Sequence, residues 1–195
     1  SMVHLTSTAT QSRGLKKYIK KFGGENHPNT KVEFNLGDII TTVIKCANGQ
    51  TIVLNHDTSS PRPYSLNFRV QGTEGIWMVD NRSIYIQGES PFEGRWESDE
   101  KYLKKYDHLL WKRFDNQAAG SGHGGMDFFI VRAFVESIRR NISPPIDVYD
   151  AASLSVISPL SEKSIRLGSS AVNIPDFTRG SWKTNKPIFG IDDNI

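Results

Sequence analysis

A histidine set among glycines is the feature of this sequence best suited to chemistry. Residues 122–125 read Gly-His-Gly-Gly, with His123 second, and Asp127 follows closely. The glycines leave the backbone around His123 uncrowded, and a helix predicted to start near Met126 offers free N–H groups and a partial positive charge. Such a place binds anionic or hydroxyl-rich ligands and favours a neutral imidazole that hydrogen-bonds to a sugar hydroxyl.

We therefore predict that His123 contacts a ligand and that Asp127 orients its ring or caps the helix. The alternative is a glycine-rich connector in which His123 only caps the helix, because motifs this short recur by chance.

A second polar segment, residues 56–64, ends a predicted strand and is stiffened by prolines on both sides of Arg62. Prolines lower the entropy that is lost when Arg62 and Tyr64 are held in place. Tyr64 combines a hydroxyl with an apolar ring, which suits the face of a sugar. The alternative is an ordinary surface loop between strands.

The remaining candidates for site chemistry have simpler explanations. The other histidines outside these segments, His4, His27 and His108, are isolated, and no two histidines have metal-ligand spacing with a carboxylate partner, so no metal site is predicted. Four acidic residues could imitate the carboxylate pair of a glycosidase, but a polar loop entering a helix explains them more simply: Glu93, Glu97, Asp99 and Glu100.

Charge and hydropathy argue against nucleic-acid and membrane partners. The 24 basic and 21 acidic residues are interspersed, and the one dense basic run, at Lys16, Lys17, Lys20 and Lys21, is typical of a solvated helix face. No stretch approaches the roughly 18 apolar residues that cross a bilayer. Cys46, the sole cysteine, excludes an intrachain disulfide and is read as a small buried hydrophobe.

The first half of the chain predicts mostly strands. Apolar spacing predicts a short amphipathic helix over residues 13–22, and Asn48-Gly49 predicts a hairpin turn between strands at 39–46 and 51–55. Further strands are expected at 64–71, 75–79 and 83–86, which makes an antiparallel meander.

The second half predicts helices. We expect one helix from Ser98 or Asp99 to about Phe114, a largely buried helix over 126–138, and a helix over 151–167 that Asp147 or Asp150 caps and Pro159 kinks. Strands followed by helices indicate an α+β fold, with one antiparallel sheet and helices on one face. The glycine-rich run follows a helix rather than a strand, so it is a poor dinucleotide-binding motif.

Nine segments, in order along the chain, closely resemble the C-terminal domain of glycoside hydrolase family 109, within the Gfo/Idh/MocA superfamily: residues 13–15, 37–39, 56–57, 60–64, 72–75, 122–127, 147–152, 159–162 and 174–180. The resemblance implies a full-length NAD-dependent α-N-acetylgalactosaminidase with an N-terminal Rossmann domain. It implies that NAD oxidises the sugar at C3, that elimination and water addition follow, and that hydride then returns.

The resemblance also implies roles for individual residues. His123 and Tyr64 match catalytic pocket residues, and Arg62, His56 and Asp127 would bind substrate, while any cofactor contact would lie near His123. A ketone acidifies the neighbouring C–H bond, so a modestly basic tyrosine or histidine could remove its proton. Two alternatives stay open: a sugar oxidoreductase of the same superfamily, and a non-catalytic carbohydrate-binding or oligomerisation module.

Length and segment order suggest the domain limits. A chain of 195 residues suits one domain. Ser1-Met2 looks like a tag remnant, so we expect residues 1–12 to lie outside the domain, a single α+β domain over 13–182 and a tail over 183–195. With the Rossmann domain absent, the piece alone is expected to be inactive. From the resemblance we expect a periplasmic or secreted, bacterial parent and a homo-oligomer through the face of the sheet.

Overall fold

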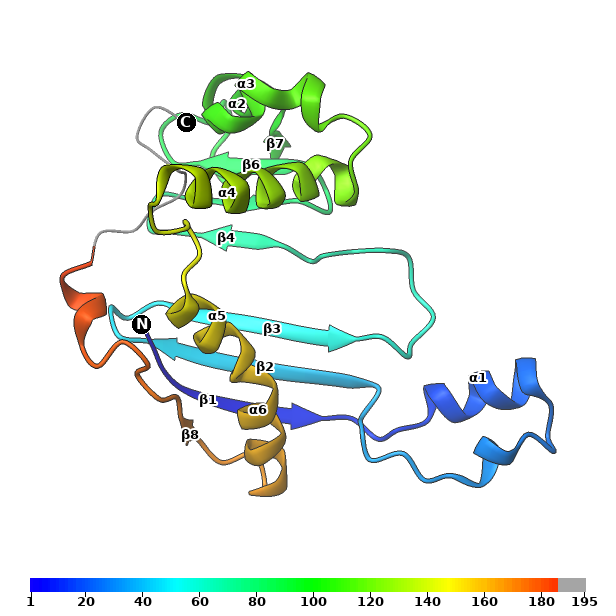
Figure 1. The fold of residues 1–195 in the computed structure, drawn as a ribbon. Coiled ribbons are helices and arrows are strands. Elements are labelled where there is room, and N and C mark those ends of the chain that lie inside the picture. The colour runs from blue at the N-terminus through cyan, green and yellow to red at the C-terminus, as the bar shows by residue number, and fades with distance from the viewer. Residues whose placement is uncertain (186–195) are drawn as a thin grey trace. The chain divides into compact units, whose positions relative to one another are not determined.

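The computed structural model describes residues 1–185, in which two units are distinguished (Figure 1). The first unit contains Ser1–Arg62 and the described residues from Pro145 on, and the second contains Pro63–Pro144. Each is described by itself below. The predicted tail begins at residue 183, and its residues 186–195 lie outside the described part.

The first unit is built on a four-stranded antiparallel sheet of order β3-β2-β1-β8. Its strands are β1 (Met2–Ala9), β2 (Ile39–Cys46), β3 (Thr51–Asp57) and β8 (Val172–Asn173). The predicted hairpin is confirmed, because β2 pairs with β3 in continuous register and Gly49 turns the chain at φ 95°. That positive φ is readily adopted by glycine, which has no Cβ to clash.

Helix α6 (Ile157–Arg166) lies across β1 and buries the core of this unit (Figure 1). Leu5 and Ile44 are fully buried there, and Val156, Ile157 and Leu160 pack against them. Placing residues 1–12 outside the domain was therefore wrong, since Met2–Ala9 pairs with strands on both sides and carries Leu5. The wider prediction of one domain over 13–182 stays a prediction.

Buried hydroxyls join the sheet to α6 beside the apolar core. The Ser164 hydroxyl accepts a hydrogen bond from the backbone N–H of Ser7 at 2.9 Å, and the Ser7 and Thr42 hydroxyls share a bond of 2.8 Å. Thr42 in turn bonds with Ser161 at 3.2 Å. Because buried polar groups are costly when unpaired, these bonds favour one placement of the helix on the sheet.

The remaining helices of the first unit mostly follow local signals. Helix α1 (Gly14–Gly23) confirms the predicted amphipathic helix, and η1 (Pro28–Lys31) is capped by His27. The predicted helix over 151–167 is instead α5 (Val148–Ser155) and α6, separated at Val156, with Pro159 in the first turn of α6, where proline is tolerated. Asp147 caps α5 in a capping box with Asp150.

The second unit contains a four-stranded antiparallel sheet of order β4-β5-β6-β7. Its strands are β4 (Arg69–Gln71), β5 (Gly75–Met78), β6 (Ser83–Ile86) and β7 (Glu97–Ser98). The α+β class and the antiparallel pairing are confirmed, but the described strands form two sheets rather than one. Helices α2 (Glu100–Tyr106), α3 (Leu109–Ala118) and α4 (Met126–Arg140) complete the unit.

Two helix predictions in this unit need correction. The helix expected from Ser98 or Asp99 to Phe114 breaks at Asp107, and His108 starts α3 by accepting a bond from the N–H of Leu110 at 3.2 Å. Asp99 makes no side-chain cap bond. Instead, its 1% exposed carboxylate accepts bonds from Trp77 Nε1 at 2.9 Å and Arg82 Nε at 3.1 Å.

Helix α4 has the predicted position but not the predicted burial. Its apolar residues Ile130, Phe134 and Ile138 are each more than 60% exposed. The burial prediction was wrong because apolar composition does not show which faces of a helix find partners. Where α4 is covered, aromatic rings hold it to α3, with the rings of Trp111 and Phe129 4.5 Å apart.

Candidate functional site

The His123 turn lies between α3 and α4 and contains a histidine–carboxylate pair. Nδ1 of His123 lies 2.9 and 3.0 Å from the two carboxylate oxygens of Asp127. An ionised carboxylate can only accept, so Nδ1 carries the hydrogen and Nε2 is the free acceptor of the neutral ring. The histidine side chain is 76% exposed. The pair can therefore present a basic nitrogen of fixed tautomer to a ligand.

The glycines around His123 are required by the geometry of this turn. A Cβ on Gly122 would collide with the Asp127 carboxylate, so glycine lets the acid approach the turn. Gly124 and Gly125 have φ of 68° and 101°, and a Cβ on Gly125 would lie 3.1 Å from the Trp111 ring. His123 itself has φ 53°, in the left-handed region. A non-glycine residue with positive φ is uncommon, and such strain concentrates at functional sites.

A hollow of about 480 Å³ lies beside this turn in the second unit. Asp127 forms part of its wall, together with residues of α4 such as Val131 and Arg132. The hollow was not foreseen from the sequence, because its lining residues alternate with residues of other faces along two helices. The spacing of four between Asp127, Val131 and Val135 is the one signal that could have found it.

Tyr64 is highly exposed, with 88% of its surface accessible. It lies in the same unit as His123, on the segment between β3 and β4. None of the three hollows described within residues 1–185 includes Tyr64. Its catalytic role stays a prediction.

The predicted substrate residues His56 and Arg62 belong to the first unit. His56 is exposed on β3 opposite Ile40. The Arg62 side chain is directed to Asp57, with Nε 3.2 Å from a carboxylate oxygen and Nη2 donating to the backbone carbonyl at 3.3 Å. Substrate binding by Arg62 would therefore compete with an existing ion pair.

The segment before Arg62 packs against the start of α1. The Asp38 carboxylate accepts bonds from the backbone N–H groups of Arg13 at 3.0 Å and Gly14 at 2.9 Å. A Cβ on Gly14 would collide with the carbonyl of Ser59, so only glycine fits there. Residues 13–14, Asp38 and Ser59 are distant in sequence and thus form one polar cluster.

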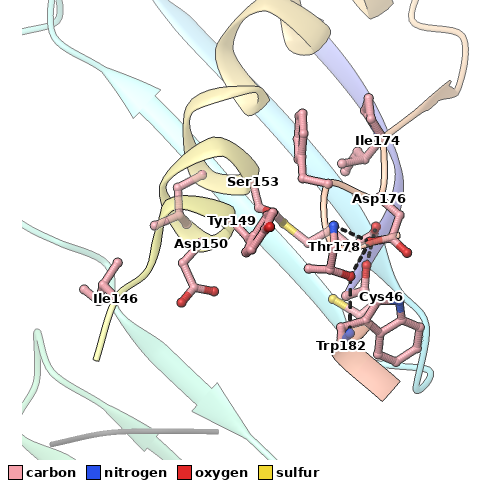
Figure 2. Close-up of a pocket in the computed structure, with 14 residues that line it drawn as sticks. Cys46, Ile146, Tyr149, Asp150, Ser153, Ile174, Asp176, Thr178 and Trp182 are labelled. Atoms are coloured by element: carbon pink, nitrogen blue, oxygen red, sulfur yellow. Dashed lines mark hydrogen bonds between the residues drawn. The ribbon is translucent and has the colours of Figure 1, made fainter. Parts of the chain in front are cut away.

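A second hollow, of about 370 Å³, lies in the first unit near Cys46, Tyr149 and Trp182 (Figure 2). Asp176 faces it but is engaged in a turn, accepting bonds from the Thr178 N–H at 3.0 Å and hydroxyl at 2.6 Å and from the Gly180 N–H at 2.8 Å. The Thr178 hydroxyl, followed by these backbone donors, holds the pKa of Asp176 below its usual value. The carboxylate therefore has a structural role.

Neither a three-residue metal cluster nor a dinucleotide-binding turn is found among residues 1–185. Within residues 1–185, no three His, Cys, Asp or Glu side chains gather as a possible metal site, and no helix there is long and apolar enough to span a membrane. The glycine-rich turn follows helix α3, whereas a dinucleotide-binding turn follows a strand. The described residues therefore do not fit a βαβ-type NAD site.

Comparisons of the sequence with known proteins agree on one family. The family model "Glycosyl hydrolase 109, C-terminal domain" matches residues 1–184. The chain is 55% identical to a glycosyl hydrolase family 109 protein of Parabacteroides distasonis and 51% identical to an alpha-N-acetylgalactosaminidase of Tannerella forsythia, covering 96% of this chain and 40% of the relative in both cases. The chain thus spans less than half the length of these relatives.

A solved structure shows the same fold at low sequence identity. Levoglucosan dehydrogenase, in complex with NADH and levoglucosan, matches with a TM-score of 0.59 and 16% identity. The match covers 90% of this chain and 45% of that protein. At this identity the likeness concerns the fold alone.

Proposed function

Because the chain belongs to the C-terminal domain family of glycosyl hydrolase 109, we propose that its parent protein is an NAD-dependent α-N-acetylgalactosaminidase. In this proposal the chain forms the sugar-binding wall of the active site, and NAD is held by sequence outside it. The observation that carries the proposal is the His123–Asp127 pair, a base whose tautomer is fixed by the carboxylate. The chain that contains this pair is 51% identical to a relative named alpha-N-acetylgalactosaminidase.

His123 and Asp127 would divide the work as base and orienting acid. The free Nε2 accepts a hydrogen bond or a proton from the sugar, while Asp127 fixes the ring and stabilises its charged form. Tyr64 would donate or accept through its hydroxyl and cover an apolar sugar face with its ring. NAD supplies hydride chemistry in such enzymes.

The test compares the longer natural protein with this chain. We expect the longer protein to retain NAD through gel filtration and to hydrolyse p-nitrophenyl α-N-acetylgalactosaminide, and this chain to do neither. A longer protein that oxidises free sugars but cleaves no glycoside would instead be a sugar oxidoreductase. One that does neither would be a carbohydrate-binding or oligomerisation module.

Two further properties belong to the same proposal. From the family resemblance we propose a periplasmic or secreted parent, which fractionation of the source cells would test. We also propose a homo-oligomer through the open face of the first unit's sheet, where Val43 and Val53 form an exposed cross-strand pair. Sedimentation velocity of Val53→Lys beside the unaltered protein would test it, because a charge at a buried contact dissociates an interface.

A further inference from the structure

Helix α1 of the first unit carries its apolar and its basic side chains on opposite faces. At 3.6 residues per turn, one face collects the apolar side chains, which are Leu15, Tyr18, Ile19 and Phe22. The other face collects the basic side chains, which are Lys16, Lys17, Lys20 and Lys21. The helix contains no acidic residue. It is therefore a cationic amphipathic helix.

The apolar face of α1 is uncovered. Tyr18 is 60% exposed and Phe22 is 66% exposed, and no residue of the helix is buried. Figure 1 shows α1 beyond the ends of β1 and β2 rather than on a face of their sheet. A surface helix of a globular protein normally turns its apolar face to the core. An apolar face left exposed in this way marks an interaction surface.

The charge of α1 indicates the kind of partner. Within residues 1–185, Glu25 pairs with Lys20 at 2.8 Å, which leaves most of the lysine charge of the helix uncompensated. Two copies of α1 packed face to face would bring these like charges together, which is unfavourable. By helical spacing Lys16 and Lys21 border the apolar face on its two sides, and Nζ of Lys21 lies 5.2 Å from the centroid of the Phe22 ring. The matching partner has anionic groups above an apolar layer, as a bilayer of anionic lipids does.

We propose that α1 lies in the surface of an anionic membrane, with Tyr18 and Phe22 below the headgroups and Lys16 and Lys21 contacting lipid phosphates. Lysine suits this place because its long stem can cover apolar surface while its ammonium group reaches the phosphates. The sequence argues against a membrane partner because no stretch is long enough to cross a bilayer, and that reason does not apply to a helix lying on the surface. The proposal is independent of the sugar chemistry.

Sedimentation with lipid vesicles tests the proposal. One set of vesicles contains phosphatidylcholine alone, and the other contains phosphatidylcholine and phosphatidylglycerol in equal parts. We expect this chain to bind the anionic vesicles and not the neutral ones, and added salt to weaken the binding. Equal binding to both sets, or equally tight binding to dextran sulfate in solution, would overturn the proposal.

Phe92 provides a matched control for Phe22. The two rings are 64% and 66% exposed, and each lies beside a cation, Arg95 at 5.7 Å and Lys21 at 5.2 Å. Phe22→Ser should weaken binding to anionic vesicles about tenfold or more, since the ring no longer leaves water, while Phe92→Ser should bind like the unaltered chain. Circular dichroism checks that both variants are folded. If both bind like the unaltered chain, the proposal is wrong.

The positions of the lysines give a second test at constant charge. One double variant carries Lys16→Gln and Lys21→Gln, which border the apolar face, and the other carries Lys17→Gln and Lys20→Gln on the far side of the helix. The first should weaken vesicle binding about tenfold or more, and the second should weaken it less. Equal weakening would show that the apolar face does not enter the membrane.

The longer natural protein decides whether α1 is available outside this chain. We expect it to bind anionic vesicles as this chain does, and to lose that binding with Phe22→Ser. A longer protein that leaves the vesicles unbound would show that its other residues cover α1, and the proposal would fail. If Phe22→Ser changes the sedimentation coefficient but not vesicle binding, the face belongs to a second copy and the proposal fails as well.

Discussion

At the scale of single residues, the histidine predicted to be catalytic is hydrogen-bonded to the acid predicted to orient it. His123 and Asp127 are four residues apart, and the turn between them brings ring and carboxylate to 2.9 Å. The sequence predicted that Asp127 would orient the ring or cap the helix. In the structure Asp127 is hydrogen-bonded to the His123 ring. Helix α4 has no side-chain cap bond at its start.

His123→Ala in the full-length parent should lower turnover far more than folding stability. A removed general base costs about 10²–10⁴ in rate, whereas a side chain that is 76% exposed contributes little to folding. Glycosidase rate and melting temperature, measured in parallel, decide it. His108→Ala is the control, because that histidine caps α3 and its loss should lower stability but not turnover. Equal loss of rate and stability in His123→Ala would refute a catalytic role.

Gly125→Ala should destabilise the protein more than Gly94→Ala. Both glycines have positive φ, which costs alanine about 1 kcal/mol. A Cβ added to Gly125 would lie 3.1 Å from the Trp111 ring, whereas a Cβ added to Gly94 would face open space. We expect the crowding to add about 1 kcal/mol or more. Urea unfolding of the two variants measures the difference, and equal costs would show that Trp111 moves aside freely.

At the scale of elements, some turns and helix ends follow from local sequence signals, and others do not. The Asn48-Gly49 turn and the Asp147 cap form as the sequence predicts, because each depends on neighbours within a few positions. The break between α2 and α3 was missed. It depends on a cap by His108, which periodicity does not reveal.

The turn at Asp176 should make stability depend on pH. Its folded pKa lies below the ordinary 3.8, so its stabilisation is present above that value and is lost as pH falls through the folded pKa. We expect the stability difference between the unaltered protein and Asp176→Ala to shrink on acidification from about pH 7 to about pH 2. Thr178→Val, which removes the strongest donor, should show a smaller pH dependence than the unaltered protein in the same denaturation series.

At the scale of the whole molecule, the first residues of the chain are part of a core. Met2–Ala9 forms an inner strand, and Leu5 on it is fully buried against Ile44 and α6. The apolar face of α4 shows the reverse, since a helix expected to be buried leaves Phe134 63% exposed.

Leu5→Ala should therefore destabilise the protein by about 2–5 kcal/mol, the cost of a cavity in a packed core. Val3→Ala on the same strand is the control, because Val3 is 42% exposed and should cost about 1 kcal/mol or less. Chemical denaturation monitored by tryptophan fluorescence measures both. Equal effects of the two substitutions would show that β1 is not part of the core.

The sequence by itself determined the class of the fold, the family and the His123 turn. Strand alternation, turn glycines and the acid Asp127, four residues after His123, all act within a few residues, so they can be recognised in the sequence. Only the tertiary structure decided that Asp99 accepts hydrogen bonds from Trp77 and Arg82, that Asp38 joins the start of α1 near Ser59, and that the Arg132 guanidinium stacks on the Phe114 ring. These facts depend on contacts between distant segments, whose pairing no local pattern specifies.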